Sequence, residues 1–235
     1  MEASYDYEKS VVLVTGVSGA LGGAIAEAFD AAGATVCGAD IVAPDDEDAL
    51  VDPAAVEFHE TDATDEGSVE ETVEAILDEH GRLDALCNVA GTWRGGDPLH
   101  ETDVAEFDTL FDVNLKSMFL TSKHAIPHLQ ETEGAIVSVS ARSSLEGGEG
   151  DGPYRASKAG VRLLTETIAE ENLGTVRANA VMPSVIDTPM NREMMPDADH
   201  DEWADPADIA DVVLFLCSSE AGVTSGAAVP VYGEA

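Results

Sequence analysis

Continuous apolar runs alternate with amphipathic segments along most of the chain. The first run, Val11–Val14, is unbroken and rich in β-branched residues, which is typical of a strand buried on both faces of a parallel sheet. Glycines at positions 16, 19 and 22 follow it, and a helix of small residues is expected over 23–29. A strand that enters a helix through closely spaced glycines predicts a βαβ unit.

The same alternation continues through the rest of the sequence. Apolar runs predict strands over 34–40, 56–60, 83–89, 134–140, 175–181 and 227–232. Periodic apolar stripes predict helices over 66–80, 103–130 and 208–217, and a further helix that carries Tyr154 and Lys158. In the long helix over 103–130, the side chains expected to point inward are Phe107, Leu110, Phe111, Met118 and Phe119. Because strands and helices alternate without repeats or linkers in 235 residues, we expect one α/β domain over 1–235, with a doubly wound parallel sheet of the Rossmann type.

The glycine turn and the end of the second strand have the chemistry of a dinucleotide site. The turn gathers backbone N–H groups and the positive end of a helix at one place, which suits a pyrophosphate. The second strand ends on Asp40, whose carboxylate can accept hydrogen bonds from an adenosine ribose and repel a 2′-phosphate. No Arg or Lys lies between Thr15 and Leu21 or directly after Asp40. These features predict NAD(H) as the cofactor, and the alternative is an ordinary βαβ unit without a ligand.

The charge balance excludes several classes of partner. The chain has 47 Asp and Glu against 11 Lys and Arg, for a formal net charge of −36. Such a surface repels nucleic acid and anionic membranes. The acidic residues are spread over amphipathic helices, so the composition does not indicate a disordered tail. In concentrated salt, where the Debye length falls to about 3 Å at 1 M, self-repulsion is screened. The composition therefore predicts a protein from a halophile.

The cysteines and the first residues of the chain indicate the cellular compartment of the protein. Cys37, Cys87 and Cys217 lie in apolar surroundings without paired spacing, so we expect buried, reduced thiols and no metal site. The first residues lack the basic and apolar regions of an export signal, and no apolar run approaches the length of a membrane span. We expect a cytoplasmic protein that acts on a small molecule.

Two motifs carry a resemblance to a known family. Thr15-Gly16-x-x-Gly19-x-x-Gly22, with Tyr154-x-x-x-Lys158 much later, resembles the short-chain dehydrogenase/reductase family, and the resemblance runs from about residue 11 to about residue 233. Tyr154 and Lys158 are four residues apart on a helix and therefore share a face. An ammonium at that distance, beside the positive charge of a nicotinamide, is expected to stabilise the phenolate and to lower the pKa of the phenol. The resemblance implies that Tyr154 is the general acid in a reduction and that Lys158 is its electrostatic partner.

The resemblance also implies further site residues. Cofactor contacts are implied for Gly16, Ser18, Ala20, Leu21, Asp40, Ile41, Asp62, Ala63, Asn88, Ala90, Gly91, Tyr154, Lys158, Pro183, Ile186 and Thr188. Asp62 would contact the adenine, although an acid at a helix N-terminus is the alternative. Asn114 would hold a water molecule of the proton relay, or satisfy the backbone inside a helix bend. Trp93 follows a strand at the edge where open α/β sheets bind ligands, and could stack on a flat substrate or belong to the core. The substrate loop is expected at about 184–206.

One member of the family's catalytic triad is missing. The family places a Ser before the Tyr to hold the substrate oxygen, and here that position is Ala141, flanked by Ser140 and Ser143. The Ala141-Arg142 pair, the sequence around Trp93 and the segment 186–199 resemble the quinonoid dihydropteridine reductase branch, which also lacks that Ser. A quinonoid ring is already electrophilic and needs only a hydride and a proton, so no oxyanion holder is required.

We therefore predict an NAD(H)-dependent reductase of a flat quinonoid or carbonyl substrate. An alcohol or carbonyl dehydrogenase that uses Ser140 or Ser143 is the first alternative. A dinucleotide-sensing protein without catalytic activity is the second, although the intact Tyr154-Lys158 pair is evidence against it. The family resemblance implies a homo-oligomer, either a homotetramer or a homodimer.

Overall fold

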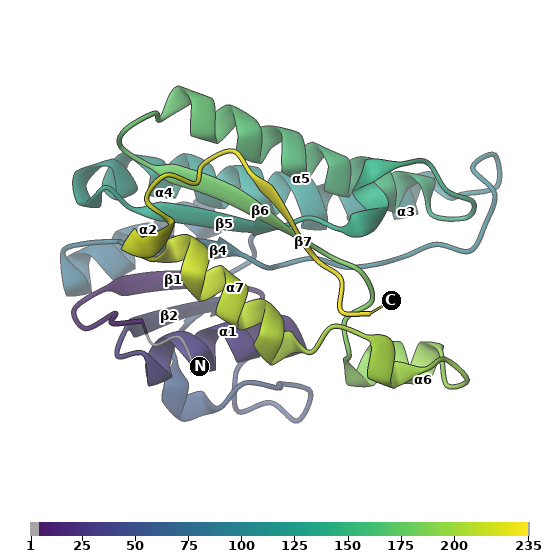
Figure 1. Ribbon diagram of the computed structural model, residues 1–235, viewed down its shortest axis with the longest axis horizontal. Coiled ribbons are helices and arrows are strands. Elements are labelled where there is room, and N and C mark those ends of the chain that lie inside the picture. Colours follow the sequence, from purple (N-terminus) through teal and green to yellow (C-terminus); the bar gives the residue numbers. More distant parts are fainter. Residues whose placement is uncertain (1–4, 235) are drawn as a thin grey trace.

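Seven parallel strands form the centre of the protein (Figure 1). The computed structural model describes residues 5–234, so the expectation for the start of the chain falls partly on residues 1–4, outside the described residues. The strand order is β3-β2-β1-β4-β5-β6-β7. The strands are β1 Val11–Thr15, β2 Thr35–Asp40, β3 Glu57–Glu60, β4 Ala85–Asn88, β5 Ala135–Val139, β6 Arg177–Pro183 and β7 Ala228–Val231. The predicted single α/β domain with a parallel sheet is confirmed, with strand ends that differ from the prediction by two residues at most.

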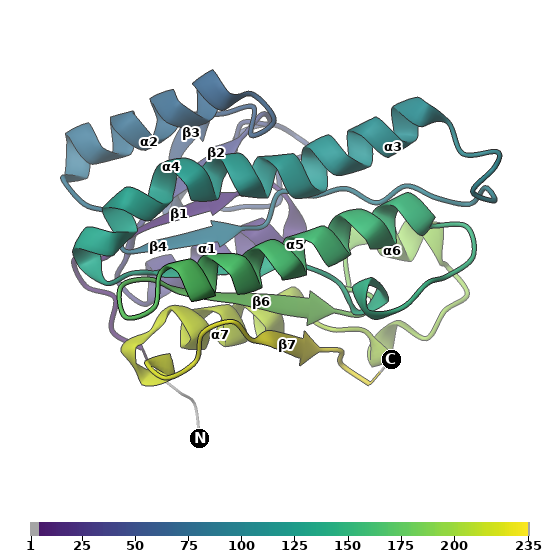
Figure 2. The ribbon, with the colours of Figure 1, turned by 90° about the horizontal axis from the view of Figure 1, so that it is seen from above.

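Helices cover both faces of the sheet (Figure 2). One face carries α1 (Ala20–Ala31) and α7 (Pro206–Cys217), and the other carries α2 (Glu66–His80), α4 (Ser117–Thr132) and α5 (Gly152–Glu171). Alternate residues of β1 feed the two cores: Val12 and Val14 pack with α1 and α7, whereas Val11 and Leu13 pack on the opposite side. The doubly wound architecture thus follows from a strand that is apolar on both faces.

The turn between β1 and α1 needs glycine at two positions. Gly16 has φ +67°, and a Cβ there would lie 2.8 Å from the backbone of Ala90. A Cβ on Gly22 would lie 2.0 Å from the carbonyl oxygen of Gly16 and 2.9 Å from Cα of Val17. These close approaches fix the first turn of α1 directly against the end of β1.

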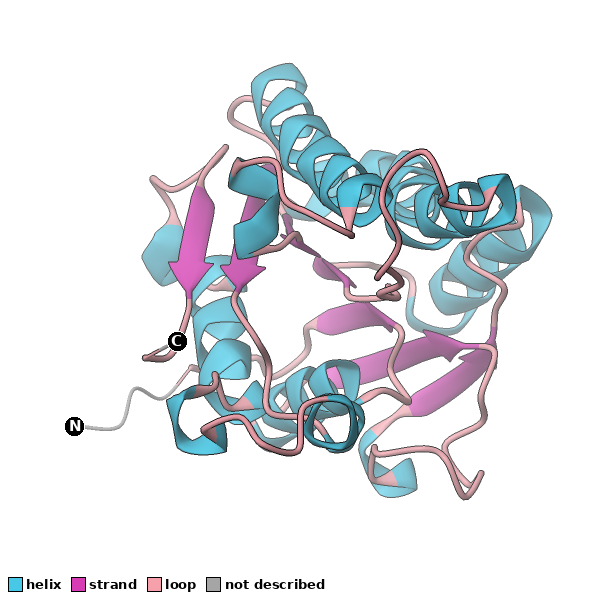
Figure 3. Cartoon of the chain, turned by 90° about the vertical axis from the view of Figure 1, so that its right-hand side faces the viewer, coloured by secondary structure: helices cyan, strands magenta, loops and turns pink. Residues whose placement is uncertain are grey.

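The strand order reverses at β1, because the chain runs outward to β2 and β3 and then returns to β4 on the other side. Such a reversal opens a crevice at the carboxyl ends of the strands. Figure 3 views the molecule from this carboxyl edge, with the ends of several strands directed toward the reader.

The helix predicted over 103–130 is interrupted. The structure has α3 (Val104–Phe111), a five-residue π-helical segment (Asp112–Lys116) and then α4. A π turn adds a residue to the helical repeat, which is how one continuous apolar pattern comes to contain a bend. The bend places Asn114 inside the protein.

The side chains predicted to point inward from that helix are only partly buried in the structure. Leu110 and Met118 are buried, as expected, and Phe111 is half-buried. Phe107 and Phe119 are wrong, because they are 44 % and 49 % exposed. Phe107 stacks on Phe111, with 4.3 Å between the ring centroids, on the outer surface of α3. Periodicity cannot distinguish an apolar side that packs on the sheet from one that faces outward.

The state of the cysteines and the apolar character of the helices were both predicted from the sequence. Cys37, Cys87 and Cys217 are free and buried, which confirms the prediction of reduced thiols. Across residues 5–234, no helix combines the length and the apolar character that a membrane span requires.

The β1–α1 turn gives a direct test of the packing. Gly22→Ala should lower the free energy of unfolding by about 1–3 kcal/mol, because the new Cβ overlaps backbone atoms that cannot move independently. Gly19→Ala is the matched control, because its Cβ would meet only the Gly16 carbonyl, at 3.5 Å. Chemical denaturation in molar salt measures both. Equal stability of the two variants would contradict this account of the turn.

Candidate active site

A large cleft of about 1360 Å³ lies at the carboxyl edge of the sheet. The β1–α1 turn, the ends of β2, β4, β5 and β6, the first turns of α5 and the segment after β6 all line it. The residues predicted for catalysis, cofactor and substrate line this cleft, apart from Ser18, Asn88 and Asn114. Side chains that are far apart in the sequence thus meet where the strand order predicts a ligand site.

The start of α1 fits an anionic phosphate group. Gly19 caps the helix and has no side chain to accept hydrogen bonds from the first turn. Gly19, Ala20 and Leu21 line the cleft, and the space over Gly19 is open except for the Gly16 carbonyl. Backbone N–H groups and the positive helix end therefore face the cleft without a competing side-chain acceptor.

Asp40 is held rigidly at the end of β2. Its Oδ2 accepts a hydrogen bond from the backbone N–H of Ser18 (3.0 Å), and its Oδ1 accepts from the N–H of Ile41 (2.7 Å) and of Val42 (3.2 Å). A carboxylate oxygen can accept more than one hydrogen bond, so Asp40 can still receive ribose hydroxyls. Because Asp40 lines the cleft, its negative charge also faces any group bound there.

The end of the cleft near β3 has the features of an adenine pocket. Ile41, Asp62 and Ala63 line it, and the Ile41 side chain is 70 % exposed. Asp62 accepts hydrogen bonds from the N–H and the hydroxyl of Thr64. These hydrogen bonds hold the pKa of the Asp62 carboxyl below its usual value. Asp65, and not Asp62, accepts the capping hydrogen bond at the start of α2.

Ser18 and Asn88 have side chains directed into the protein. The Ser18 hydroxyl donates to the carbonyl of Val42, which closes the loop after β2. The Asn88 amide nitrogen donates to Ser122 Oγ (3.1 Å) and Ser138 Oγ (3.2 Å), and its oxygen accepts from the Thr121 hydroxyl. Asn88 therefore fastens β4 to α4 and β5. Thr15, which the sequence analysis did not single out, accepts from the N–H groups of Val89 and Ala90 and positions the same strand end.

Lys158 is wholly buried beneath the cleft. Its Nζ donates a hydrogen bond to the carbonyl oxygen of Val139, 2.9 Å away. Burial lowers the pKa of the Lys158 ammonium to about 8. A Cβ on Gly91 would lie 3.0 Å from that Nζ and 3.1 Å from Oδ1 of Asn114, so the glycine allows β4 to approach both groups.

Tyr154 is one turn before Lys158 on α5. Burial, and secondly the charge of Asp151, raise the pKa of Tyr154 to about 12. The sequence expectation that Lys158 lowers this pKa concerned the lysine together with the positive charge of a nicotinamide, and it stays a prediction; in the protein by itself burial and Asp151 dominate. A phenol with this pKa stays protonated at neutral pH and is able to donate a proton.

Asn114 joins the π segment to the loop after β4. Its Oδ1 accepts from the N–H of Thr92 (2.8 Å), and its Nδ2 donates to the carbonyl of Thr92 (3.0 Å) and to Ser157 Oγ (3.1 Å). Asn114 thus satisfies backbone groups beside the bend, as one of the two sequence interpretations proposed.

The position of the missing serine is occupied by a buried methyl group. Ala141 lines the cleft, beside two hydroxyl groups. The Ser140 hydroxyl donates to the carbonyl of Lys158 (2.8 Å) and lies 3.2 Å from Ser144 Oγ. Ser140 therefore fastens the end of β5 to α5, and Ser143 is half-buried at the cleft wall.

Trp93 and the segment after β6 form the outer wall of the cleft. The Trp93 side chain is 47 % exposed, so the core interpretation is wrong. Opposite the nucleotide end, α6 (Pro189–Met194) begins with Thr188, whose hydroxyl accepts from the N–H of Asn191. Met190, Met194 and Met195 also line the cleft, and the sequence analysis missed them because scattered methionines give no periodic signal.

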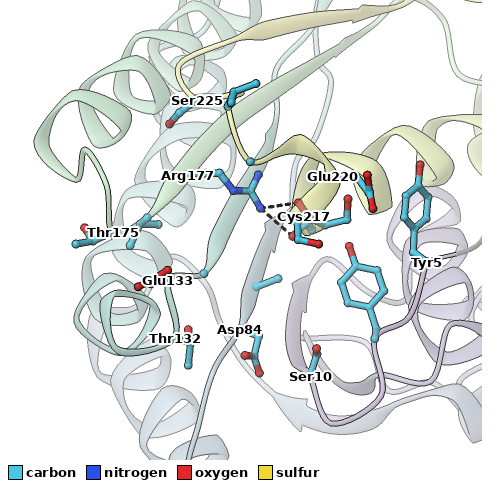
Figure 4. Close-up of a pocket in the computed structure, with 18 of the residues that line it drawn as sticks. Tyr5, Ser10, Asp84, Thr132, Glu133, Thr175, Arg177, Cys217, Glu220 and Ser225 are labelled. Carbon is cyan, nitrogen blue, oxygen red and sulfur yellow. Dashed lines mark hydrogen bonds between the residues drawn. The ribbon is translucent and has the colours of Figure 1, made fainter.

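A second cavity, of about 840 Å³, lies at the opposite edge of the sheet (Figure 4). Ser10, Asp84 and Glu133 line it from the segments that precede β1, β4 and β5. Arg177 extends across it and donates hydrogen bonds to the carbonyls of Leu216, Cys217 and Ser218 at the end of α7. None of the predicted catalytic residues lines this cavity, whereas four of them line the cleft at the carboxyl edge: Tyr154, Lys158, Ser140 and Ser143.

Comparisons with known proteins agree with this geometry. A family model described as enoyl-(acyl carrier protein) reductase matches residues 16–233. The chain is 33 % identical to the 3-oxoacyl-[acyl-carrier-protein] reductase FabG of Thermotoga maritima over 96 % of this chain and 97 % of that protein. It is 33 % identical to the meso-2,3-butanediol dehydrogenase of Serratia marcescens over 97 % and 95 %, respectively.

A solved structure shows the same fold. The ligand-free aldohexose dehydrogenase of Thermoplasma acidophilum superposes with a TM-score of 0.86 at 30 % identity, over 98 % of this chain and 94 % of that one. With a family match over most of the chain and the Tyr154-Lys158 pair in the cleft, the chain belongs to the short-chain dehydrogenase/reductase family and is an oxidoreductase of that family.

Proposed function

We propose that the protein is an NAD(H)-dependent reductase of a flat quinonoid substrate, similar in type to quinonoid dihydropteridine reductase. The observation that carries the proposal is Ala141, which puts a methyl group in the cleft where the family has a hydroxyl. A substrate that needs its oxygen held by that hydroxyl would be reduced poorly here. A quinonoid ring avoids this requirement, because it accepts a hydride without developing a localised oxyanion.

The nicotinamide cofactor, when bound, supplies or accepts the hydride. The residues that would hold it are the N–H groups at the start of α1 for the pyrophosphate, Asp40 for the adenosine ribose and Asp62 with Ile41 for the adenine. Pro183, Ile186 and Thr188 would hold the carboxamide, and Lys158 the second ribose. Gly16 and Gly91 both line the cleft, and a Cβ would displace the Ala90 backbone at the first position and crowd Lys158 Nζ at the second.

Tyr154 supplies the proton. The phenol is protonated at neutral pH and can donate its proton, and because its raised pKa makes it a weaker acid, the transfer depends on stabilisation of the phenolate. Lys158 lies one helical turn away with a pKa near 8 and would stabilise the phenolate that remains. Trp93, exposed on the outer wall, offers a flat face against which a planar ring can stack.

A second candidate function is the reduction of a carbonyl group or the oxidation of an alcohol. The names of the relatives favour it, because they include a meso-2,3-butanediol dehydrogenase and an aldohexose dehydrogenase. In this case Ser143, at the cleft wall, or Ser140 would replace the missing hydroxyl. A catalytically inactive dinucleotide sensor would have no use for a buried lysine beside a tyrosine, so we rank it last.

We also propose that the protein is a homodimer or homotetramer in the cytoplasm of a halophile. Apolar side chains on the outer sides of α3, α4 and α5 are available for contacts between subunits: Val104, Phe107, Phe119 and Leu163 are exposed. The charge of −36 is the basis for the salt-adapted setting.

Cofactor preference tests the role of Asp40. The kcat/KM with NAD(H) should exceed that with NADP(H) by about tenfold or more, because the Asp40 carboxylate repels the 2′-phosphate of NADP(H). Two like charges 4 Å apart repel by about 1 kcal/mol in water, and the repulsion is stronger in a cleft that excludes water. Asp40→Asn should reduce the preference, and Asp48→Asn, another acid of the cleft wall, should leave it unchanged. Comparable kcat/KM values for the two cofactors with the unaltered enzyme would disprove the assignment.

Salt dependence tests the setting. The Tm should rise from dilute to molar KCl, since screening removes self-repulsion, and each kcal/mol gained raises the Tm by about 2–4 °C in a protein of this size. Chloride is chosen over sulfate because sulfate also strengthens apolar burial. A Tm that does not respond to KCl would contradict the halophilic interpretation.

Substitution at the active site tests the two candidate functions. Tyr154→Phe should lower kcat by about 10²–10⁴-fold with little change in NADH affinity, as is typical for loss of a general acid. Ser140→Ala and Ser143→Ala should each cost much less than the roughly 10²–10³-fold of an oxyanion donor. Turnover is measured at saturating NADH in molar salt, on the substrate that the enzyme reduces fastest. If either Ser variant loses as much as Tyr154→Phe, the carbonyl dehydrogenase becomes the better account.

A further inference from the structure

Three side chains with metal-binding donor atoms meet at the β3 edge of the sheet, away from the catalytic cleft. Cys37 of β2 pairs in register with Glu57 of β3, so the two side chains lie on the same face. Cys37 packs with Val73 and Ile76 of α2, which places this face beneath that helix, as Figure 2 shows. His80 is the last residue of α2. None of the three donor residues lines the cleft.

The donor atoms are close enough to share one ion. Sγ of Cys37, a carboxylate oxygen of Glu57 and an imidazole nitrogen of His80 all lie within 4.8 Å of one another. His80 Nε2 and Glu57 Oε2 are 2.8 Å apart. Zinc bonds of about 2.0–2.3 Å in a tetrahedral arrangement place donors about 3.3–3.8 Å apart. Rotamer adjustments of about 1 Å, without backbone movement, therefore bring the three atoms to a zinc ion.

The exposure of the three groups provides both access and protection. Cys37 is buried, the His80 side chain is 16 % exposed and the Glu57 side chain is 49 % exposed. An ion can enter from the Glu57 side and reach the thiol at the inner end. The carboxylates of Glu57 and Glu79 act on Cys37 and raise its pKa further after burial, so the pocket has negative potential that a cation would relieve.

A second imidazole lies near the three donors, on the same strand as Glu57. His59 is two residues after Glu57 and so lies on the same face of β3. Its Nε2 is buried and has no hydrogen-bond partner. Glu57, Glu79 and His80 all act electrostatically on this imidazole, which places it in the same neighbourhood. His59 is not one of the three residues whose donor atoms lie within 4.8 Å of one another, so it neighbours the site and is not one of its ligands.

We propose that Cys37, Glu57 and His80 form a binding site for a borderline-soft divalent cation, Zn²⁺ by its donor set, with the fourth position open to a solvent molecule. One thiolate, one carboxylate and one imidazole are ligands that zinc accepts, and Mg²⁺ and Ca²⁺ do not favour the thiolate and the imidazole. Binding forms the metal–sulfur bond as the thiol proton leaves to solvent, and no electron is transferred. The ion would join β2, the edge strand β3 and the end of α2, and so stabilise the side of the sheet that ends in Asp40 and Asp62.

Cobalt spectroscopy tests the site directly. The reduced, chelator-treated full-length protein is titrated with Co²⁺ in molar KCl, where screening suppresses weak binding to the acidic surface. We expect one equivalent to give a thiolate-to-cobalt charge-transfer band in the near ultraviolet and intense visible bands of four-coordinate cobalt. Zn²⁺ should abolish both, and Zn²⁺ should raise the Tm whereas Mg²⁺ should not.

Matched variants separate this site from other donors. Cys37→Ser should remove the charge-transfer band, and His80→Gln and Glu57→Gln should each weaken binding by about 10- to 100-fold or more. His100→Gln removes an exposed His–Glu pair that has no thiol, and Cys217→Ser removes a thiol from the other core. Both controls should bind cobalt as the unaltered protein does. Far-ultraviolet circular dichroism verifies folding, and the surface variant His80→Gln keeps the test valid if Cys37→Ser unfolds.

Three results would overturn the proposal. The charge-transfer band could be absent, which would mean that carboxylates alone bind the ion. The band could survive Cys37→Ser and disappear in Cys217→Ser. That result would assign binding to Cys87 and Cys217, whose thiols interact with each other in the core beneath α1 and α7. Finally, His80→Gln and Glu57→Gln could bind Co²⁺ with unchanged affinity, which would leave the Glu57–His80 pair as an ordinary ion pair.

Discussion

The hydrogen bond from the buried ammonium of Lys158 to the carbonyl of Val139 is the interaction on which the active site depends. It joins α5 to the end of β5, and Ser140 strengthens the same junction by donating to the Lys158 carbonyl. Because Tyr154 lies one turn earlier on α5, its position follows from this junction. A charged group held this far from water is costly, and the lowered pKa of Lys158 is the measurable sign of that cost.

The proposed reduction relies on Tyr154 as the proton donor. Burial and the charge of Asp151 raise the pKa of Tyr154, so the phenol carries its proton at neutral pH. The Ser140 hydroxyl is bonded to a backbone carbonyl, which is consistent with the proposal that Tyr154 donates to the substrate. A substrate that already carries an electrophilic ring needs little more than this donor and a hydride.

The sequence was informative where function depends on local backbone. Gly16, Gly22 and Asp40 were predicted correctly as parts of one turn and one strand end, because a tight strand–helix turn leaves few alternatives to glycine. Properties that depend on the tertiary surroundings of a side chain could not be predicted from the sequence. Phe107 and Phe119 fit the helical periodicity yet face outward, and the burial that raises the pKa of Tyr154 is not visible in the local sequence pattern. The Cys37, Glu57 and His80 cluster was missed for the same reason, since its members come from three separate elements.

The most direct test of the central claim is the oxidation of NADH by the purified protein in molar KCl, with a panel of quinonoid dihydropterins, ketones and aldoses. The account predicts that a quinonoid compound has the highest kcat/KM, by about tenfold or more, which corresponds to about 1.4 kcal/mol of transition-state stabilisation. Efficient reduction of a ketone or an aldose, with quinonoid compounds inert, would contradict the role assigned to Ala141.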